Sequence, residues 1–153
     1  MKELYVMVGV PASGKSTWIK NQDWALGLTI VSTDAFVEDY ARECGSTYSE
    51  VFEEYMPRAI ELMLNQVEFA RAHKHDIIWD QTSTTILTRA KKIRMLPDYY
   101  KIAVVFKTPP MEELKARLAS RAGKVVPMEV VESMIAKWEE PTKEEGFDEI
   151  WYN

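Results

Sequence analysis

The sequence predicts an α/β fold of three layers, in which about five mostly parallel strands carry helices on both faces. Two observations lead to it: short apolar runs recur along the 153 residues, and the segments between them repeat apolar residues at helical spacing. Strands that alternate with helices need crossover connections, which make the sheet mostly parallel. The length suits one domain, so we expect residues 1–153 to form a single unit.

Five apolar runs are the candidate strands. They are short and rich in β-branched and aromatic residues, as is typical of buried parallel strands. The runs are Leu4–Val8, Leu28–Val31, Ile77–Trp79, Ile102–Phe106 and Glu149–Tyr152. Ligands of such sheets bind beyond the carboxyl ends of the strands, so the residues that directly follow these runs are the candidates for function.

Three segments show helical character. Apolar residues step by three or four between Phe52 and Ala70, which predicts one apolar helix face. Pro57 falls inside this stretch, so we expect a kink there or a new helix beside it. Met111–Ala122 and Met128–Trp138 each follow a proline, a residue that suits the start of a helix.

The composition is that of a globular protein, with 46% hydrophobic and 28% charged residues. The single cysteine, Cys44, excludes an internal disulfide and a metal site built from several thiolates. No apolar run is long enough to span a membrane, and residues 1–5 do not resemble a signal peptide. We therefore expect a soluble cytosolic protein without a membrane partner. No motif indicates an oligomeric state.

A phosphate-binding motif follows the first strand. The G-x-x-x-x-G-K-[ST] pattern is complete in Gly9, Val10, Pro11, Ala12, Ser13, Gly14, Lys15, Ser16 and Thr17. Glycines let successive backbone N–H groups point at phosphate oxygens, and the following helix adds its positive N-terminus. Lys15 is expected to reach the β- and γ-phosphates, and the Ser16 hydroxyl to bind Mg²⁺. The sequence thus predicts a P-loop NTPase-type fold that binds ATP or GTP.

Asp34 follows the second strand and is the candidate general base. A kinase needs a carboxylate opposite the phosphate loop, where it takes the proton of the attacking hydroxyl. The alternative is that Asp34 caps the next helix.

Asp80 and Thr82 follow the third strand in the same way. Asp80 would hold a Mg²⁺-bound water or position another group of the site. The Thr82 hydroxyl would bind the substrate. Both residue types are also common in turns.

Two arginines, Arg117 and Arg121, lie four apart in a predicted helix and therefore share a face. Arginines placed there stabilise charge on a transferring phosphate, although a solvated basic face has the same pattern. A glycine break at Gly123 separates this helix from the next one. Residues 112–137 are therefore expected to form a helical lid over the nucleotide.

In this order, the motifs resemble the P-loop kinases that phosphorylate the 5′-hydroxyl end of DNA or RNA, typified by bacteriophage polynucleotide kinase. The resemblance spans nearly the whole chain. It rests on GVPASGKSTW, STD, IIWDQTS, RLASRAGKVVP and EEPTKEEGFDEI. It implies an ATP-dependent, Mg²⁺-dependent enzyme in which Lys15 and Ser16 serve ATP, Asp34 is the base, and Arg121 acts on the transferring phosphate beside Arg117.

The acceptor side departs from that family. The family's acceptor-binding arginine is replaced by Val37, and the acidic residues Glu38 and Asp39 follow. Phe36 keeps the aromatic character of its position, where it would stack on a base or pack in the core. A nucleoside, a hydroxymethylated base or another small alcohol is therefore an alternative acceptor to a polynucleotide end.

Charge distribution is the remaining evidence on the acceptor. The net charge is −5. Residues 84–124, however, hold ten basic and three acidic side chains, which leaves a net charge of −12 on the rest. The run Thr88–Arg94, with Arg89 in it, follows the third strand, so we expect it to border the acceptor cleft and attract a polyanion. The alternatives are a solvated helix face and, for the whole chain, a nucleotide-dependent switch without phosphotransfer.

Overall fold

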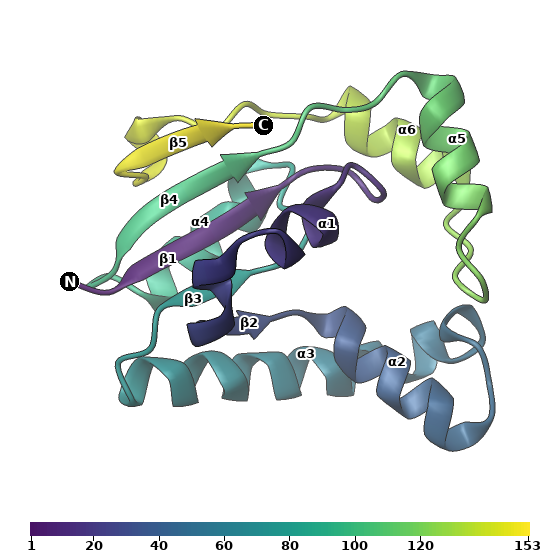
Figure 1. The fold of residues 1–153 in the computed structure, drawn as a ribbon, viewed down its shortest axis with the longest axis horizontal. Helices are drawn as coiled ribbons and strands as arrows, with labels where there is room; N and C mark the ends of the chain where they lie inside the picture. Colours follow the sequence, from purple (N-terminus) through teal and green to yellow (C-terminus); the bar gives the residue numbers. More distant parts are fainter.

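The computed structural model describes residues 1–153, and its centre is a five-stranded sheet in the order β2-β3-β1-β4-β5 (Figure 1). All neighbouring strands are parallel. The strands are β1 (Glu3–Val8), β2 (Thr29–Val31), β3 (Ile77–Trp79), β4 (Tyr100–Val105) and β5 (Glu149–Tyr152). All five predicted strands are confirmed, with ends that differ by two residues at most.

Helices cover both faces of the sheet, as predicted. On one face, the side chains of Leu4, Val6 and Val8 pack against helix α3 (Tyr48–Ala72) and the end of helix α4 (Ile86–Met95). On the other face, Tyr5 and Met7 pack against helix α1 (Lys15–Lys20) and the 3-10 helix η1 (Asp23–Gly27). Alternate residues of β1 thus face opposite layers, which is why its run is apolar throughout.

Helices α2 (Thr33–Cys44) and α3 pack on each other through a small core of Val37, Ala41, Val51 and Ala59. Helix α3 is continuous across Pro57, so the prediction of a new helix at this proline is wrong. Proline removes one backbone hydrogen bond to the carbonyl of Glu53. That residue is exposed, so water can satisfy the carbonyl.

Helices α5 (Met111–Ala119) and α6 (Met128–Ala136) stand beyond the carboxyl ends of the strands, and the loop between them reaches toward α2 (Figure 1). They share a core with the phosphate loop, made of Val10, Leu114, Leu118 and Val131. Both helices end two or three residues earlier than predicted. A 3-10 helix, η2 (Lys143–Glu145), precedes β5.

None of the helices is both long and apolar enough to cross a membrane.

Candidate active site

The loop after β1 forms a cradle that opens toward the lid. Gly14 has φ of +103°, a conformation that glycine adopts without strain, and helix α1 starts at the next residue. The ammonium of Lys15 donates to the carbonyls of Gly9 and Val10, at 2.7 and 2.9 Å. The lysine side chain therefore lies back over its own loop, where it lines the cleft.

Gly9 and Ser13 lie in close contact within this loop. A Cβ at Gly9 would stand 2.5 Å from the Ser13 hydroxyl oxygen and 3.1 Å from Cβ of Phe106, so only glycine fits. The Ser13 hydroxyl is buried and has no hydrogen-bond partner. A buried polar group without a partner is costly, so this hydroxyl is an unsatisfied group in the wall of the cradle.

Lys15 and Asp80 influence each other electrostatically. Burial lowers the pKa of Lys15 to about 8, an effect that the Asp80 carboxylate opposes and the Arg121 guanidinium reinforces. Burial likewise raises the pKa of Asp80 above its usual range, while Lys15 acts in the opposite sense.

The loop after β3 is held between the phosphate loop and β2. Thr82 O accepts from Gly9 N at 2.9 Å, and Asp80 N donates to Val31 O at 2.8 Å.

Asp34 lies in the first turn of α2, at the carboxyl end of β2. The cap of this helix is Ser32, whose hydroxyl accepts from Asp34 N at 3.1 Å, so the interpretation of Asp34 as the cap is wrong. The carboxylate is free for other partners. Tyr48 donates its hydroxyl to Oδ1 at 2.7 Å, and the Lys124 ammonium lies 3.1 Å from Oδ2.

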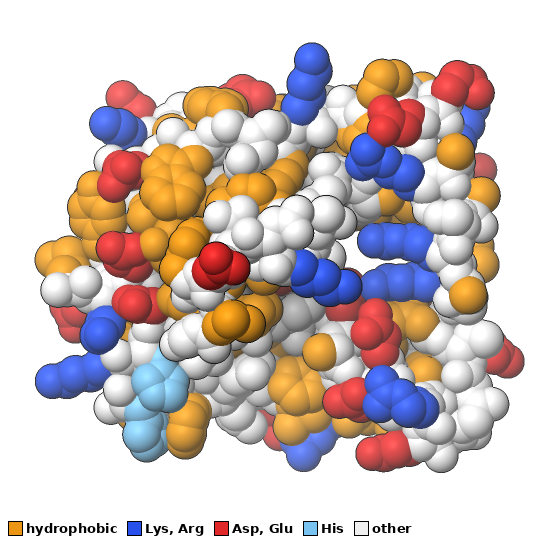
Figure 2. All heavy atoms as spheres, in the orientation of Figure 1, with side chains coloured by type: hydrophobic (Ala, Val, Ile, Leu, Met, Phe, Trp, Pro, Cys, Tyr) orange, Lys and Arg blue, Asp and Glu red, His pale blue; other side chains and the backbone are white.

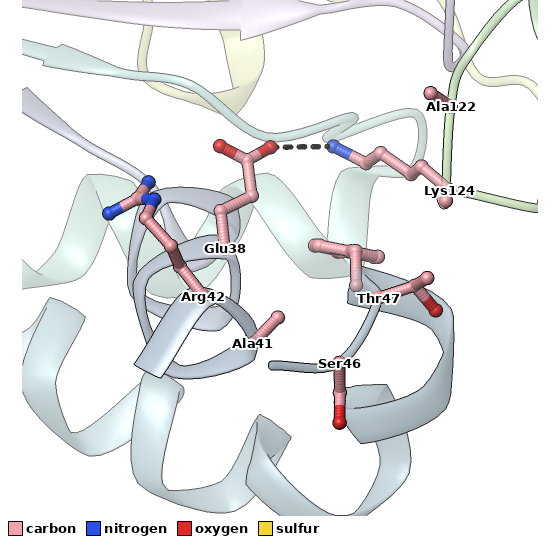
Figure 3. A pocket seen from close by; sticks show the side chains of 9 residues that line it. Glu38, Ala41, Arg42, Ser46, Thr47, Ala122 and Lys124 are labelled. Atoms are coloured by element: carbon pink, nitrogen blue, oxygen red, sulfur yellow. Dashed lines mark hydrogen bonds and ion pairs between the residues drawn. The ribbon is translucent and has the colours of Figure 1, made fainter. Parts of the chain in front are cut away.

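Tyr48 and Lys124 were not predicted as site residues. Burial, followed by the hydrogen bond to Asp34, raises the pKa of Tyr48 above its ordinary value. Lys124 lies over the Tyr48 ring, 4.4 Å from its centroid, and also pairs with Glu38 at 3.4 Å (Figure 3). Lys124 belongs to the glycine break of the lid, but nothing in the sequence pairs it with Asp34, which is 90 positions away along the chain.

The loop between α5 and α6 contacts the start of α3. Ser49 N donates to Gly123 O at 3.1 Å, and Val125 N donates to the Ser49 hydroxyl at 2.7 Å. Gly123 packs so tightly on Thr47 that a Cβ would come within 3.1 Å of Thr47 Cβ. Arg117, from α5, donates to Ala12 O at 3.0 Å and to Glu113 at 2.5 Å.

These groups surround one cleft of about 1240 Å³ between the sheet, α3 and the lid. Figure 2 shows the hollow, with Lys and Arg side chains gathered around it. The predicted site residues that line it are Ala12, Ser13, Gly14, Lys15, Ser16, Thr17, Asp34, Asp80, Thr82, Arg117 and Arg121. The structure thus brings the phosphate loop, the candidate base and both lid arginines to one cavity. Gly9 lies in the wall of the cradle through its carbonyl contact with Lys15.

Arg89 does not reach the cleft, and its predicted role in substrate binding is wrong. Its side chain is 0% exposed and donates to both carboxylate oxygens of Glu145, at 2.7 and 3.1 Å. It also donates to the carbonyls of Ser83 and Glu139, each at 2.9 Å. The hydrogen bonds of the Arg89 guanidinium thus hold α4 against the segment that precedes β5.

The basic surface predicted for residues 84–124 is also incomplete. Lys92 is buried with its ammonium 5.4 Å from the centroid of the Trp79 ring, and Lys101 is buried on the carbonyls of Pro97 and Tyr99. Lys91 and Arg94 are exposed. The positive charge of residues 84–124 is therefore partly internal and does not form a continuous surface track.

Phe36 packs between two hydrophobic cores and does not line the cleft, which agrees with the predicted alternative of core packing. Val37, the residue at the position of the family's acceptor-binding arginine, is completely buried. The first turns of α2 thus use their apolar residues for the core.

The residues present fit a magnesium ion that arrives with a nucleotide. The Ser16 hydroxyl is exposed at the start of α1 in the cradle, and Asp80 lines the same cleft. Oxygen donors of this kind suit Mg²⁺, which binds through few protein groups plus substrate phosphates and water. The chain has no cluster of three or more His, Cys, Asp or Glu side chains that would hold a metal alone.

The sheet order and the phosphate loop define a P-loop nucleotide-binding protein of kinase-like fold. The chain belongs to an AAA domain family, whose model matches residues 4–141.

Solved structures share this fold at low sequence identity. A candidate kinase from Chloroflexus aurantiacus is 19% identical, with a TM-score of 0.74 over 99% of this chain and 84% of that one. A sugar kinase from a Janibacter species is 18% identical, with a TM-score of 0.60 over 99% and 86%. A gluconokinase from Sinorhizobium meliloti is 18% identical, with a TM-score of 0.55 over 98% and 81%.

Proposed function

We propose that the protein is an ATP-dependent kinase that transfers the γ-phosphate to a hydroxyl group of a small molecule. The observation that carries the proposal is that Asp34 lines the same cleft as the phosphate loop and the lid arginines. A nucleotide switch needs no carboxylate opposite the phosphate loop, whereas a kinase needs one.

The chemistry follows from these positions. Asp34 accepts the proton of the acceptor hydroxyl while the hydroxyl oxygen attacks the γ-phosphorus. The bond between the γ-phosphorus and its bridging oxygen breaks, and ADP leaves with the electron pair. Lys15 and Arg121 stabilise the charge that develops on the phosphoryl oxygens. Mg²⁺, bound to the nucleotide phosphates with Ser16 as its protein ligand, would neutralise part of their charge.

A small acceptor is favoured over the polynucleotide end that the sequence resemblance implies. The buried Arg89, Lys92 and Lys101 cannot contact a phosphate backbone. The acidic Glu50 and Glu53 line the cleft beside α3, where they would repel one. The structural neighbours named for their substrates are a gluconokinase and a sugar kinase, which supports the same choice.

The test is transfer of radiolabelled γ-phosphate from ATP to panels of polyols, sugars, nucleosides and 5′-hydroxyl oligonucleotides. We expect transfer to a small alcohol, lost in Lys15→Ala and reduced about 10²- to 10⁴-fold in Asp34→Asn. Asp39→Asn is the matched control, since Asp39 is on the same helix and pairs only with Arg42. Labelling of oligonucleotide ends alone would restore the polynucleotide function. ATP binding without any transfer would indicate a switch.

A further inference from the structure

The half of the cleft next to α3 is walled by apolar side chains on two opposite sides. Phe52 and Met56 come from α3, and Val126, Val130 and Met134 come from the lid. Two of these side chains are exposed: Phe52 is 39% exposed and Val130 is 43% exposed. A ligand with an apolar body would cover surface that otherwise contacts water, which is favourable.

The cleft carries charges of both signs. Lys15, Arg117 and Arg121 line it, and a triphosphate would engage them. The charged residues of α3 that line the cleft are Glu50 and Glu53.

Two sets of contacts keep the charge of the cleft beside α3 negative. Hydrogen bonds from Thr47, chiefly from its backbone N–H, lower the pKa of Glu50, so this carboxylate stays ionised. Lys124, which also lines the cleft, is already paired with Asp34 and Glu38. Of the cations that line the cleft, Lys124 is therefore already paired, and Lys15, Arg117 and Arg121 are those that a triphosphate would engage.

We infer that the phosphate acceptor is an alcohol with an apolar ring or alkyl body, without a phosphate or carboxylate, and that Phe52, Met56 and Val130 determine this specificity. The inference rests on the proposed kinase function. The hydroxyl to be phosphorylated would face Asp34. A second polar group of the acceptor would meet Gln81 and Thr82, which line the same cavity.

The experiment compares acceptors that all carry neighbouring hydroxyl groups but differ in charge and in apolar surface. Phosphate transfer is measured with 3-phenylpropane-1,2-diol, cyclohexane-1,2-diol, glycerol, gluconate and glycerol 3-phosphate. We expect kcat/KM for the two apolar diols to exceed that for gluconate and glycerol 3-phosphate at least tenfold. A preference for either anionic acceptor would overturn the inference and leave the kinase function standing. Absence of transfer to every compound, with ATP bound, would overturn both.

Two variants locate the specificity. Phe52→Ala should raise KM for the better apolar diol about tenfold, with KM for ATP changed less than twofold. The matched control is Phe69→Ala, on the same helix and 56% exposed but outside the cleft. Glu53→Lys should raise kcat/KM for gluconate at least fivefold, because it replaces a repelling charge by an attracting one. Equal effects of Phe52→Ala and Phe69→Ala, or no gain for gluconate, would contradict the assignment of this wall.

Discussion

The ammonium of Lys124, at the tip of the lid, lies 3.1 Å from Oδ2 of Asp34, the carboxylate that we propose as general base. The lysine is 17% exposed and the aspartate 51% exposed, so the pair is partly screened by water. Closure of the lid and the electrostatic environment of the base are therefore linked through one contact.

Lys124→Met should loosen the lid, because it removes the pairing with Asp34 and Glu38 and keeps an apolar stem against Tyr48. A pair of this exposure is worth about 1 kcal/mol, so closure should weaken roughly fivefold. Spin labels on the native Cys44, which is exposed, and on Ala122→Cys would report the distance between α2 and the lid tip. We expect a broader and longer distribution than in the parent protein. Lys115→Met, an exposed change on α5, is the control, and equal distributions in all three proteins would contradict the role of the pair.

Affinity for ATP should depend on pH through Lys15. Its pKa is lowered to about 8 by burial, so the ammonium that attracts phosphate is lost as the pH rises through this value. Affinity should be constant below about pH 7 and fall by up to tenfold per pH unit above pH 8. Asp80→Asn should shift the fall to lower pH, since the Asp80 carboxylate raises the pKa of Lys15. Calorimetric titration between pH 6 and 9.5 measures both effects, and a pH-independent affinity would rule out this role of Lys15.

The two lid arginines should differ in their effects on kinetics. Arg121 makes no ion pair in the structure and lines the cleft, so Arg121→Met should lower kcat about 10²- to 10³-fold with little change in KM. Arg117 instead donates to Ala12 O in the phosphate loop, so Arg117→Met should mainly raise KM for ATP. Steady-state kinetics with the best acceptor separate the two cases. A lower kcat for Arg117→Met and a higher KM for Arg121→Met would contradict the assignment.

Arg89 should stabilise the folded protein. Arg89→Met leaves the Glu145 carboxylate buried without its partner, which costs about 3–5 kcal/mol in the free energy of unfolding. Lys91→Met, exposed on the same helix, should change it by less than about 0.5 kcal/mol. Urea denaturation followed by circular dichroism measures both variants. If Arg89→Met kept its stability but bound the acceptor more weakly, the result would support the role of Arg89 in substrate binding.

The strands and the phosphate loop could be predicted from the sequence because their signals are local. An apolar run such as Leu4–Val8 marks a buried strand by itself, and the position of Asp34 follows from the rule that strand ends meet at one edge. The structure places this aspartate in the cleft with the loop.

The errors concern residues whose environment is set by distant partners. Arg89 is buried because Glu145, 56 positions away, meets it with a bidentate pair. The sequence within α4 resembles an exposed basic helix and has no sign of this partner. Likewise, the pairing of Lys124 with Asp34 spans 90 positions and depends on the lid being folded over α3.

The contacts of Arg89 also define which part of the lid is free to move. Arg89 holds Glu139 O, and Glu139 N donates to Thr84 O at 2.9 Å, so the chain just after α6 is anchored beneath α4. At the other end, Leu114 and Leu118 share a core with Val10 of the phosphate loop. We therefore expect the two helices of the lid to stay in place and only its tip, residues 121–126, to move. Substrate exchange would then require breaking only the few contacts of that tip.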